Sequence, residues 1–214
     1  MESAIESIAG ISISNQNATD HVFFVDSNLI AISNFTMEIS TATPATQKKR
    51  WSDGDSQLGA TWMEYQTPQQ GTWWGDWQPA SCVHPNTHGD LPVTVSLTRN
   101  VSHRGTWKPG FNLDFGKSSS LHSGHETVKL NTISEMAWYA IPAYGYGQAW
   151  SQQLMVWQDQ QRRSCKMEHY GPGGVTCGEW SDFFRGDLPV KNGVNFAWFT
   201  DWKKLDFNSC GGGT

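Results

Sequence analysis

The alternation of apolar and polar residues is the feature that most constrains the fold of this chain. Successive side chains of a β-strand point to opposite faces, so this period indicates strands that bury one face. The alternating runs are short, and clusters of Gly, Pro, Asn and Ser separate them. The sequence predicts strands at 21–26, 29–40, 58–66, 92–100, 110–116, 127–141, 152–163, 164–169, 175–180 and 194–202.

Many short strands with hardly any helical period predict an all-β fold. We expect a jelly-roll-like antiparallel β-sandwich or a flattened barrel, with long loops and little helix. The predicted β domain covers residues 21–210, after an N-terminal segment 1–20 that is flexible or a short helix, and before a flexible tail 211–214. Residues 41–55 and 66–86 are expected to be long loops, where binding residues usually lie.

The four cysteines predict two disulfides. Cys165 and Cys177 flank a Gly- and Pro-rich turn at 170–174, and a hairpin folded about Gly171 places them opposite each other. Facing positions of an antiparallel pair are close enough for a disulfide, which leaves Cys82 and Cys210 to pair with each other. An even set with no C-x-x-C spacing favours disulfides over a zinc site, so we expect no metal.

Composition restricts the partners and the compartment. A net charge of −5 with no basic stripe argues against a nucleic-acid partner. No apolar run is long enough for a transmembrane segment, and the first residues lack the pattern of a signal peptide. The predicted disulfides and a charged fraction of only 16% nevertheless favour secretion, with a leader removed or replaced.

Three sequons allow N-linked glycans, at Asn17, Asn34 and Asn100. A chain this rich in Ser, Thr and Asn holds about two sequons by chance, so their placement matters more than their number. Asn34 and Asn100 fall in the polar phase of their predicted strands. Both side chains are therefore expected to face water, where a glycan can be accommodated.

The chain contains 12 tryptophans, and two groups of aromatic residues fall in predicted loops rather than in strand phase. Aromatic rings with a polar edge suit stacking on a sugar or a planar organic molecule, although a β-protein core also absorbs many of them. The remaining strand-phase tryptophans are expected to pack in the core. We predict a lectin-like pocket that binds a sugar or small organic ligand between two walls, Trp73, Trp74 and Trp77 on one side and Tyr144, Tyr146 and Trp150 on the other.

An enzyme on the same scaffold is the alternative. Glu64 shares a strand face with Trp62, and Glu135 shares one with Tyr139, the arrangement in which paired carboxylates of a glycan hydrolase or lyase would act. His125, beside Glu126, is a candidate general base. A shape-driven cyclase or cycloaddition enzyme acting on an aromatic or polyene compound needs no nucleophile. No cofactor motif is present in the sequence, and we expect no cofactor.

Residues 137–187 resemble the actinoporin-like cytolysins. The resemblance is carried by the sequence Tyr-Ala-Ile-Pro at 139–142 with the aromatic residues that follow it, by Arg162-Arg163, and by the Arg-Gly-Asp at 185–187. It covers about a quarter of the chain. That family is a β-sandwich whose aromatic cluster binds phosphocholine head groups, so the resemblance implies a second alternative, a membrane toxin that binds head groups.

Overall fold

The computed structural model describes residues 31–39, 58–167 and 175–210. The predicted segments 1–20 and 211–214, the predicted strand 21–26 and the sequon at Asn17 lie outside these residues. The strands are β1 (Ala31–Ile39), β2 (Leu58–Trp74), β3 (Gln78–Pro79), β4 (His84–Pro85), β5 (Val93–Arg104), β6 (Thr106–Trp107), β7 (Leu130–Ile141), β8 (Tyr146–Met167), β9 (Val175–Cys177) and β10 (Phe184–Phe199). The helical elements are α2 (Leu113–Ser120), η1 (Leu121–Ser123) and η2 (Trp202–Lys204).

The chain divides into two compact units. Among the described residues, unit 1 contains those up to Gln69 and Asp159–Phe184, and unit 2 contains Gln70–Gln158 and the residues from Arg185 onward. Strands β2 and β8 contribute residues to both units. Each unit is therefore built partly from a section of the same two long strands.

Unit 1 consists of antiparallel pairs. Strand β1 pairs with β2 with a register shift between Ser33 and Thr36. Strand β9 pairs with β8, and the register places Cys165 opposite Cys177. The disulfide between these two cysteines forms as the sequence predicts, and Cys82 is bonded to Cys210 in unit 2, which confirms the second predicted pair.

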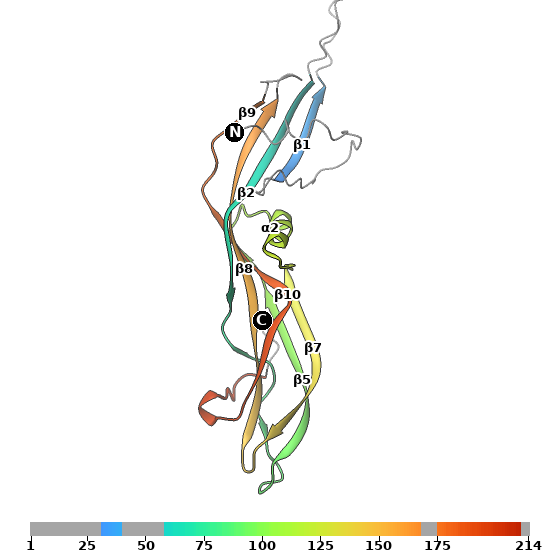
Figure 1. The fold of residues 1–214 in the computed structure, drawn as a ribbon, viewed down its shortest axis with the longest axis vertical. Helices are drawn as coiled ribbons and strands as arrows, with labels where there is room; N and C mark the ends of the chain where they lie inside the picture. Colours follow the sequence, from blue (N-terminus) through green and yellow to red (C-terminus); the bar gives the residue numbers. More distant parts are fainter. Residues whose placement is uncertain (1–30, 40–57, 168–174, 211–214) are drawn as a thin grey trace, which may run out of the picture. The chain divides into compact units, whose positions relative to one another are not determined.

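Unit 2 contains two layers of strands. In one layer β8 neighbours β10 and β10 neighbours β6, while β3 and β4 pair with other parts of β8. The other layer is β5 with β7, which lie side by side in twelve consecutive cross-strand pairs (Figure 1). A buried core of Ala80, Val101 and Ala149 joins the layers, and residues of β7 and β10 pack against it. The all-β, sandwich-like prediction is confirmed, and the described strands do not close into a barrel.

The absence of a side chain at Gly147 of β8 lets the Trp198 ring pack directly against the backbone of that strand. Gly147 is buried, and an added Cβ would overlap the Trp198 ring. That ring stacks on Tyr139 with centroids 4.3 Å apart, and its Nε1 donates to the carbonyl of Ala140. Trp198 is therefore a packing residue, as its strand phase predicts.

The predicted strand 110–116 is wrong, because most of it belongs to helix α2. The apolar residues 111, 113 and 115 alternate as they would in a strand. The side chain of Asn112, however, accepts the backbone N–H of Phe115 and caps a helix that buries Phe115, Ser119 and Ser120. None of the helices among the described residues is long and apolar enough to cross a membrane.

Two predicted loops are also corrected. Residues 66–86 do not form one loop, because β2 continues to Trp74 and β3 and β4 follow it. The second group of aromatic residues, predicted to lie in a loop before the strand at 152–163, is mostly at the beginning of β8, a single strand that extends to Met167. Residues 147–149 are all buried, so this part of the strand shows no alternation between apolar and polar faces.

Candidate functional site

Aromatic residues from three parts of the chain meet beside β8. Tyr146 and Trp150 are four positions apart on that strand. Strand β3 pairs Pro79 with Trp150, which brings Trp77 to this strand as well. The rings of Trp77 and Trp150 both contact Phe199 of β10, at 6.1 and 6.0 Å between centroids. The structure thus brings Trp77 of one predicted wall and Trp150 of the other together through Phe199. The sequence analysis does not identify Phe199 as a site residue.

The segment after β10 adds two exposed rings beside Tyr146. Tyr146 contacts Trp202 at 5.4 Å and Phe207 at 5.7 Å, and the latter two rings are 4.5 Å apart. Trp202 is 61% exposed and Phe207 is 47% exposed. We call the set Trp77, Tyr146, Trp150, Phe199, Trp202 and Phe207 the aromatic cluster. The prediction that Trp202 lies in a strand and packs in the core is wrong, because it lies on η2 and faces solvent.

A buried amide holds the segment that carries these exposed rings. Gln148 is fully buried, and its Nε2 lies within hydrogen-bond distance of the carbonyls of Ser81, Asp206 and Ser209. Its Oε1 accepts the backbone N–H of Asp206 at 2.8 Å. The disulfide of Cys210 ties the end of the segment to Cys82. The exposed rings are therefore presented by a segment that is fixed in place, which lowers the entropy cost of binding a ligand.

The side chain of Asp206 stabilises the same segment. Its carboxylate accepts the hydroxyl of Ser209 at 2.7 Å and the backbone N–H of Asn208 at 2.9 Å, and these bonds lower the pKa of Asp206. A lowered pKa in the folded state means that this contribution is present above the unfolded pKa and is lost as the pH falls through the folded value. The segment should consequently loosen only in acid.

Tyr144 occupies an exposed turn between β7 and β8 with an unusual backbone. Its φ is 54°, in the left-handed region, and its side chain is 77% exposed. Its N–H donates to the carbonyl of Gly89, and its ring lies within contact distance of a Cβ built on Gly89. A bulky residue with positive φ is strained, and such strain is found most often at functional positions. Tyr144 therefore stays a candidate ligand-binding residue.

The remaining residues of the first predicted wall lie along β2. Trp73 and Trp74 are the last residues of that strand, and both are exposed. The Nε1 of Trp73 donates to Asp187 of β10 at 3.2 Å. These two tryptophans are thus strand residues rather than loop residues, and Trp73 is oriented by β10.

A second cluster, in unit 1, is centred on Glu64. This predicted catalytic carboxylate is fully buried, with 0% of its surface exposed. Trp62 Nε1 donates to its Oε1 at 3.1 Å, and Arg163 Nε donates to its Oε2 at 2.8 Å. The Arg163 guanidinium also lies over the Trp180 ring, 4.5 Å from the centroid. Glu64 is therefore half of a buried ion pair whose other half packs on an indole.

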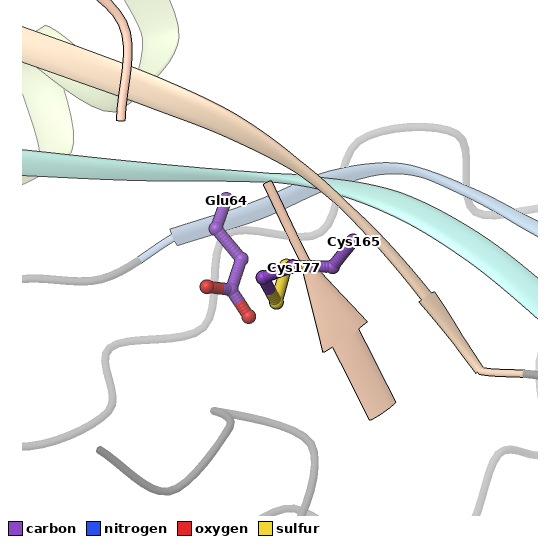
Figure 2. A group of neighbouring side chains, drawn as sticks. All are labelled: Glu64, Cys165 and Cys177. Carbon is purple, nitrogen blue, oxygen red and sulfur yellow. A yellow bond between two sulfur atoms is a disulfide. The ribbon is translucent and has the colours of Figure 1, made fainter. Parts of the chain in front are cut away.

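The Cys165–Cys177 disulfide lies beside this ion pair. Figure 2 shows the Glu64 carboxylate next to the two bonded sulfur atoms. A carboxylate oxygen and both sulfurs all lie within 4.8 Å of one another. Glu64 and Cys165 are buried, and Cys177 is partly buried.

The other predicted catalytic residues lie in unit 2. Glu135 of β7 forms an ion pair with Arg99, its register partner on β5. His125 is partly buried in the segment between η1 and β7. Both Glu64 and Glu135 are paired with an arginine, Glu64 in unit 1 and Glu135 in unit 2. A hydrolase that uses paired carboxylates remains a sequence prediction only.

The similarity of this chain to known proteins is weak. No family model matches the chain. It is 28% identical over 146 residues, 60% of this chain, to the uncharacterized protein YCL049C of Saccharomyces cerevisiae, and it spans 46% of that protein's length. The parasporin-2 toxin of Bacillus thuringiensis is 11% identical, with a TM-score of 0.30, over 66% of this chain and 75% of the toxin. Neither likeness identifies a family.

Proposed function

We propose that this chain is an extracellular protein that binds carbohydrate through the aromatic cluster. The observation that carries the proposal is Trp202, an indole 61% exposed on a segment held by Gln148 and the Cys82–Cys210 disulfide. Trp202 contacts Tyr146 and Phe207, so the exposed rings form a contiguous apolar patch of the kind that marks a binding site, and the C–H faces of a sugar stack well on indole. Trp202 would be the stacking platform.

Polar groups near the cluster could hydrogen-bond a sugar. Lys203 and Lys204 of η2 are exposed beside Trp202 and carry ammonium donors. Lys204 lies 5.4 Å from the centroid of the Phe199 ring. A platform with a few donors around it is the general composition of a small-ligand site.

Secretion is part of the same proposal. Two disulfides are typical of proteins that fold in an oxidising compartment. Asn100 is exposed on β5, as its sequon requires, and accepts the Ser134 hydroxyl. Glycan attachment at Asn100 and Asn34 remains a proposal that mass spectrometry of the secreted protein would test.

The alanine variant of Trp202 tests the binding site. A glycan array would first identify the sugar, and calorimetric titration would then measure its affinity. We expect Trp202→Ala to weaken binding by about 30-fold, the effect of losing roughly 2 kcal/mol at a central aromatic contact. Trp138→Ala is the matched control, because Trp138 is 71% exposed but lies on β7. Equal affinities of the two variants, or an array on which no glycan binds, would reject the proposal.

Tyr144→Gly separates binding from folding. Glycine adopts positive φ without strain, so we expect thermal stability to be unchanged or higher by up to about 1 kcal/mol. Sugar affinity should nevertheless fall by about tenfold, because the exposed ring is lost. Asn192→Gly relieves the same kind of strain, at φ 59°, and should leave affinity unchanged. If Tyr144→Gly binds as tightly as the unmodified protein, Tyr144 has no part in the site.

The two-stranded sheet favours membrane permeabilisation as a second candidate. Strands β5 and β7 have 12 residues each, and a strand that crosses a bilayer needs about 9–11. On β5 the residues Thr94, Ser96 and Thr98 are exposed and alternate with more buried apolar residues. The edges of both strands would have to pair with further copies in lipid, and the Arg99–Glu135 pair would have to remain intact there.

Vesicles test this second candidate directly. Phosphocholine vesicles loaded with a fluorescent dye would be mixed with micromolar protein, and the released dye measured. If the unmodified protein releases the dye and Trp202→Ala does not, permeabilisation depends on the aromatic cluster. If both proteins release the dye, permeabilisation depends on another surface. Vesicles that keep their dye would remove the candidate.

A further inference from the structure

We infer that Glu64, Cys165 and Cys177 form a zinc-binding site when their disulfide is reduced. The three side chains offer two sulfur atoms and one carboxylate oxygen, and all three ligand atoms already lie within 4.8 Å of one another. Thiolate sulfur with a carboxylate oxygen is a ligand set that Zn²⁺ accepts, in tetrahedral geometry. Three protein ligands leave the fourth position of the tetrahedron for water.

The β-sheet keeps the two sulfurs together after the bond between them is cut. Cys165 and Cys177 are register partners on β8 and β9, and the pairs Lys166–Thr176 and Met167–Val175 continue the same ladder. The backbone of Gly178 also donates to the carbonyl of Ser164. The backbone hydrogen bonds of this ladder are separate from the sulfur–sulfur bond, so we expect the two thiols to stay on facing positions when that bond is cut.

The third ligand is already oriented by its neighbours. Trp62 donates to one carboxylate oxygen of Glu64, and Arg163 donates to the other. Oε2 also lies 2.7 Å from Nη2 of Arg163, so Oε1, which accepts the bond from Trp62, is the oxygen that keeps a lone pair for a metal ion. Hydrogen bonds of this kind from outside the ligand set fix the orientation of the ligand and are a usual feature of metal sites.

Charge balance favours a divalent ion in this buried place. With the disulfide intact, Glu64 and Arg163 neutralise each other. In the metal-bound state two thiolates and one carboxylate carry three negative charges, which one divalent ion and the Arg163 guanidinium match. A buried group of charges is tolerated only when it is balanced in this way. A monovalent ion would leave the group with a net negative charge.

The redox step is a thiol–disulfide exchange. A dithiol reductant supplies two electrons and two protons, becomes a disulfide itself, and leaves Cys165 and Cys177 as thiols. Metal binding then displaces both thiol protons to solvent, so affinity rises with pH. In a reducing environment, a metal ion bound by Glu64, Cys165 and Cys177 would therefore replace the disulfide as the link between β8 and β9.

Cobalt substitution tests the site. The whole protein would be reduced with a phosphine, desalted under argon and titrated with Co²⁺, whose thiolate complexes have a charge-transfer absorption band. We expect this band to appear and to disappear on addition of Zn²⁺. The double variant Cys165→Ser/Cys177→Ser should lack the band, whereas Cys82→Ser/Cys210→Ser should keep it. Absence of the band in the reduced wild type, or its persistence without Cys165 and Cys177, would overturn the inference.

Glu64→Gln shows whether the folded site, rather than two free thiols, binds the ion. We expect Co²⁺ affinity to fall at least about tenfold, with near-ultraviolet circular dichroism reporting that the fold is kept. A titration of the reduced wild type in concentrated urea covers the case in which this variant fails to fold. Affinity as high in urea as in buffer would show that folding contributes nothing and would also overturn the inference.

Discussion

Arg163→Ala is expected to lower the free energy of unfolding by about 3–5 kcal/mol, the cost of leaving a buried charge without its partner. Glu64 is fully buried, and without Arg163 its carboxylate keeps only the hydrogen bond from Trp62 among the contacts described. The variant also loses the packing of the guanidinium on Trp180. Chemical denaturation followed by fluorescence and by circular dichroism would measure the change.

Arg162→Ala is the matched control for this experiment. Arg162 is the neighbouring residue, but it is exposed and its side chain lies over the Phe184 ring at 5.1 Å. We expect a loss of about 1 kcal/mol or less, as for other exposed cation–π contacts. Similar losses in the two variants would show that the Glu64–Arg163 pair contributes little. The double variant Arg163→Met/Glu64→Leu should then recover most of the stability lost in Arg163→Ala, because neither charge remains buried.

The sequence correctly predicts those features of the fold that depend on residues close together in the chain. Alternation identifies most of the strands, and the symmetry of Cys165 and Cys177 about a Gly-rich turn predicts their pairing, which the structure confirms. The sequence does not predict helix α2, because the apolar residues 111, 113 and 115 alternate as they would in a short strand. The signal that could have identified it is Asn112, an N-cap residue three positions before the buried Phe115.

Contacts between distant residues have no such local signal. Glu64 and Arg163 are 99 positions apart, and nothing near either residue indicates the other. The sequence predicts Glu64 to be a carboxylate beside an indole, and the structure confirms that contact, but the ion pair with Arg163 has no local signal. Phe199 and Phe207 join the aromatic cluster only because β10 and the segment after it lie against β8.

The largest effect on the presentation of the aromatic cluster is expected from Cys82→Ser/Cys210→Ser. This disulfide joins residues 128 positions apart, and loop-closure entropy gives it about 5 kcal/mol of stabilisation, against about 3 for the pair Cys165–Cys177, which are 12 apart. Thermal unfolding of the two double serine variants should reproduce this order. Sugar affinity should fall in the Cys82/Cys210 variant and not in the other, because Trp202 lies on the segment that Cys210 anchors. If the two variants lose equal stability and bind equally, that disulfide does not hold the segment in place, and the binding site must be sought on another surface.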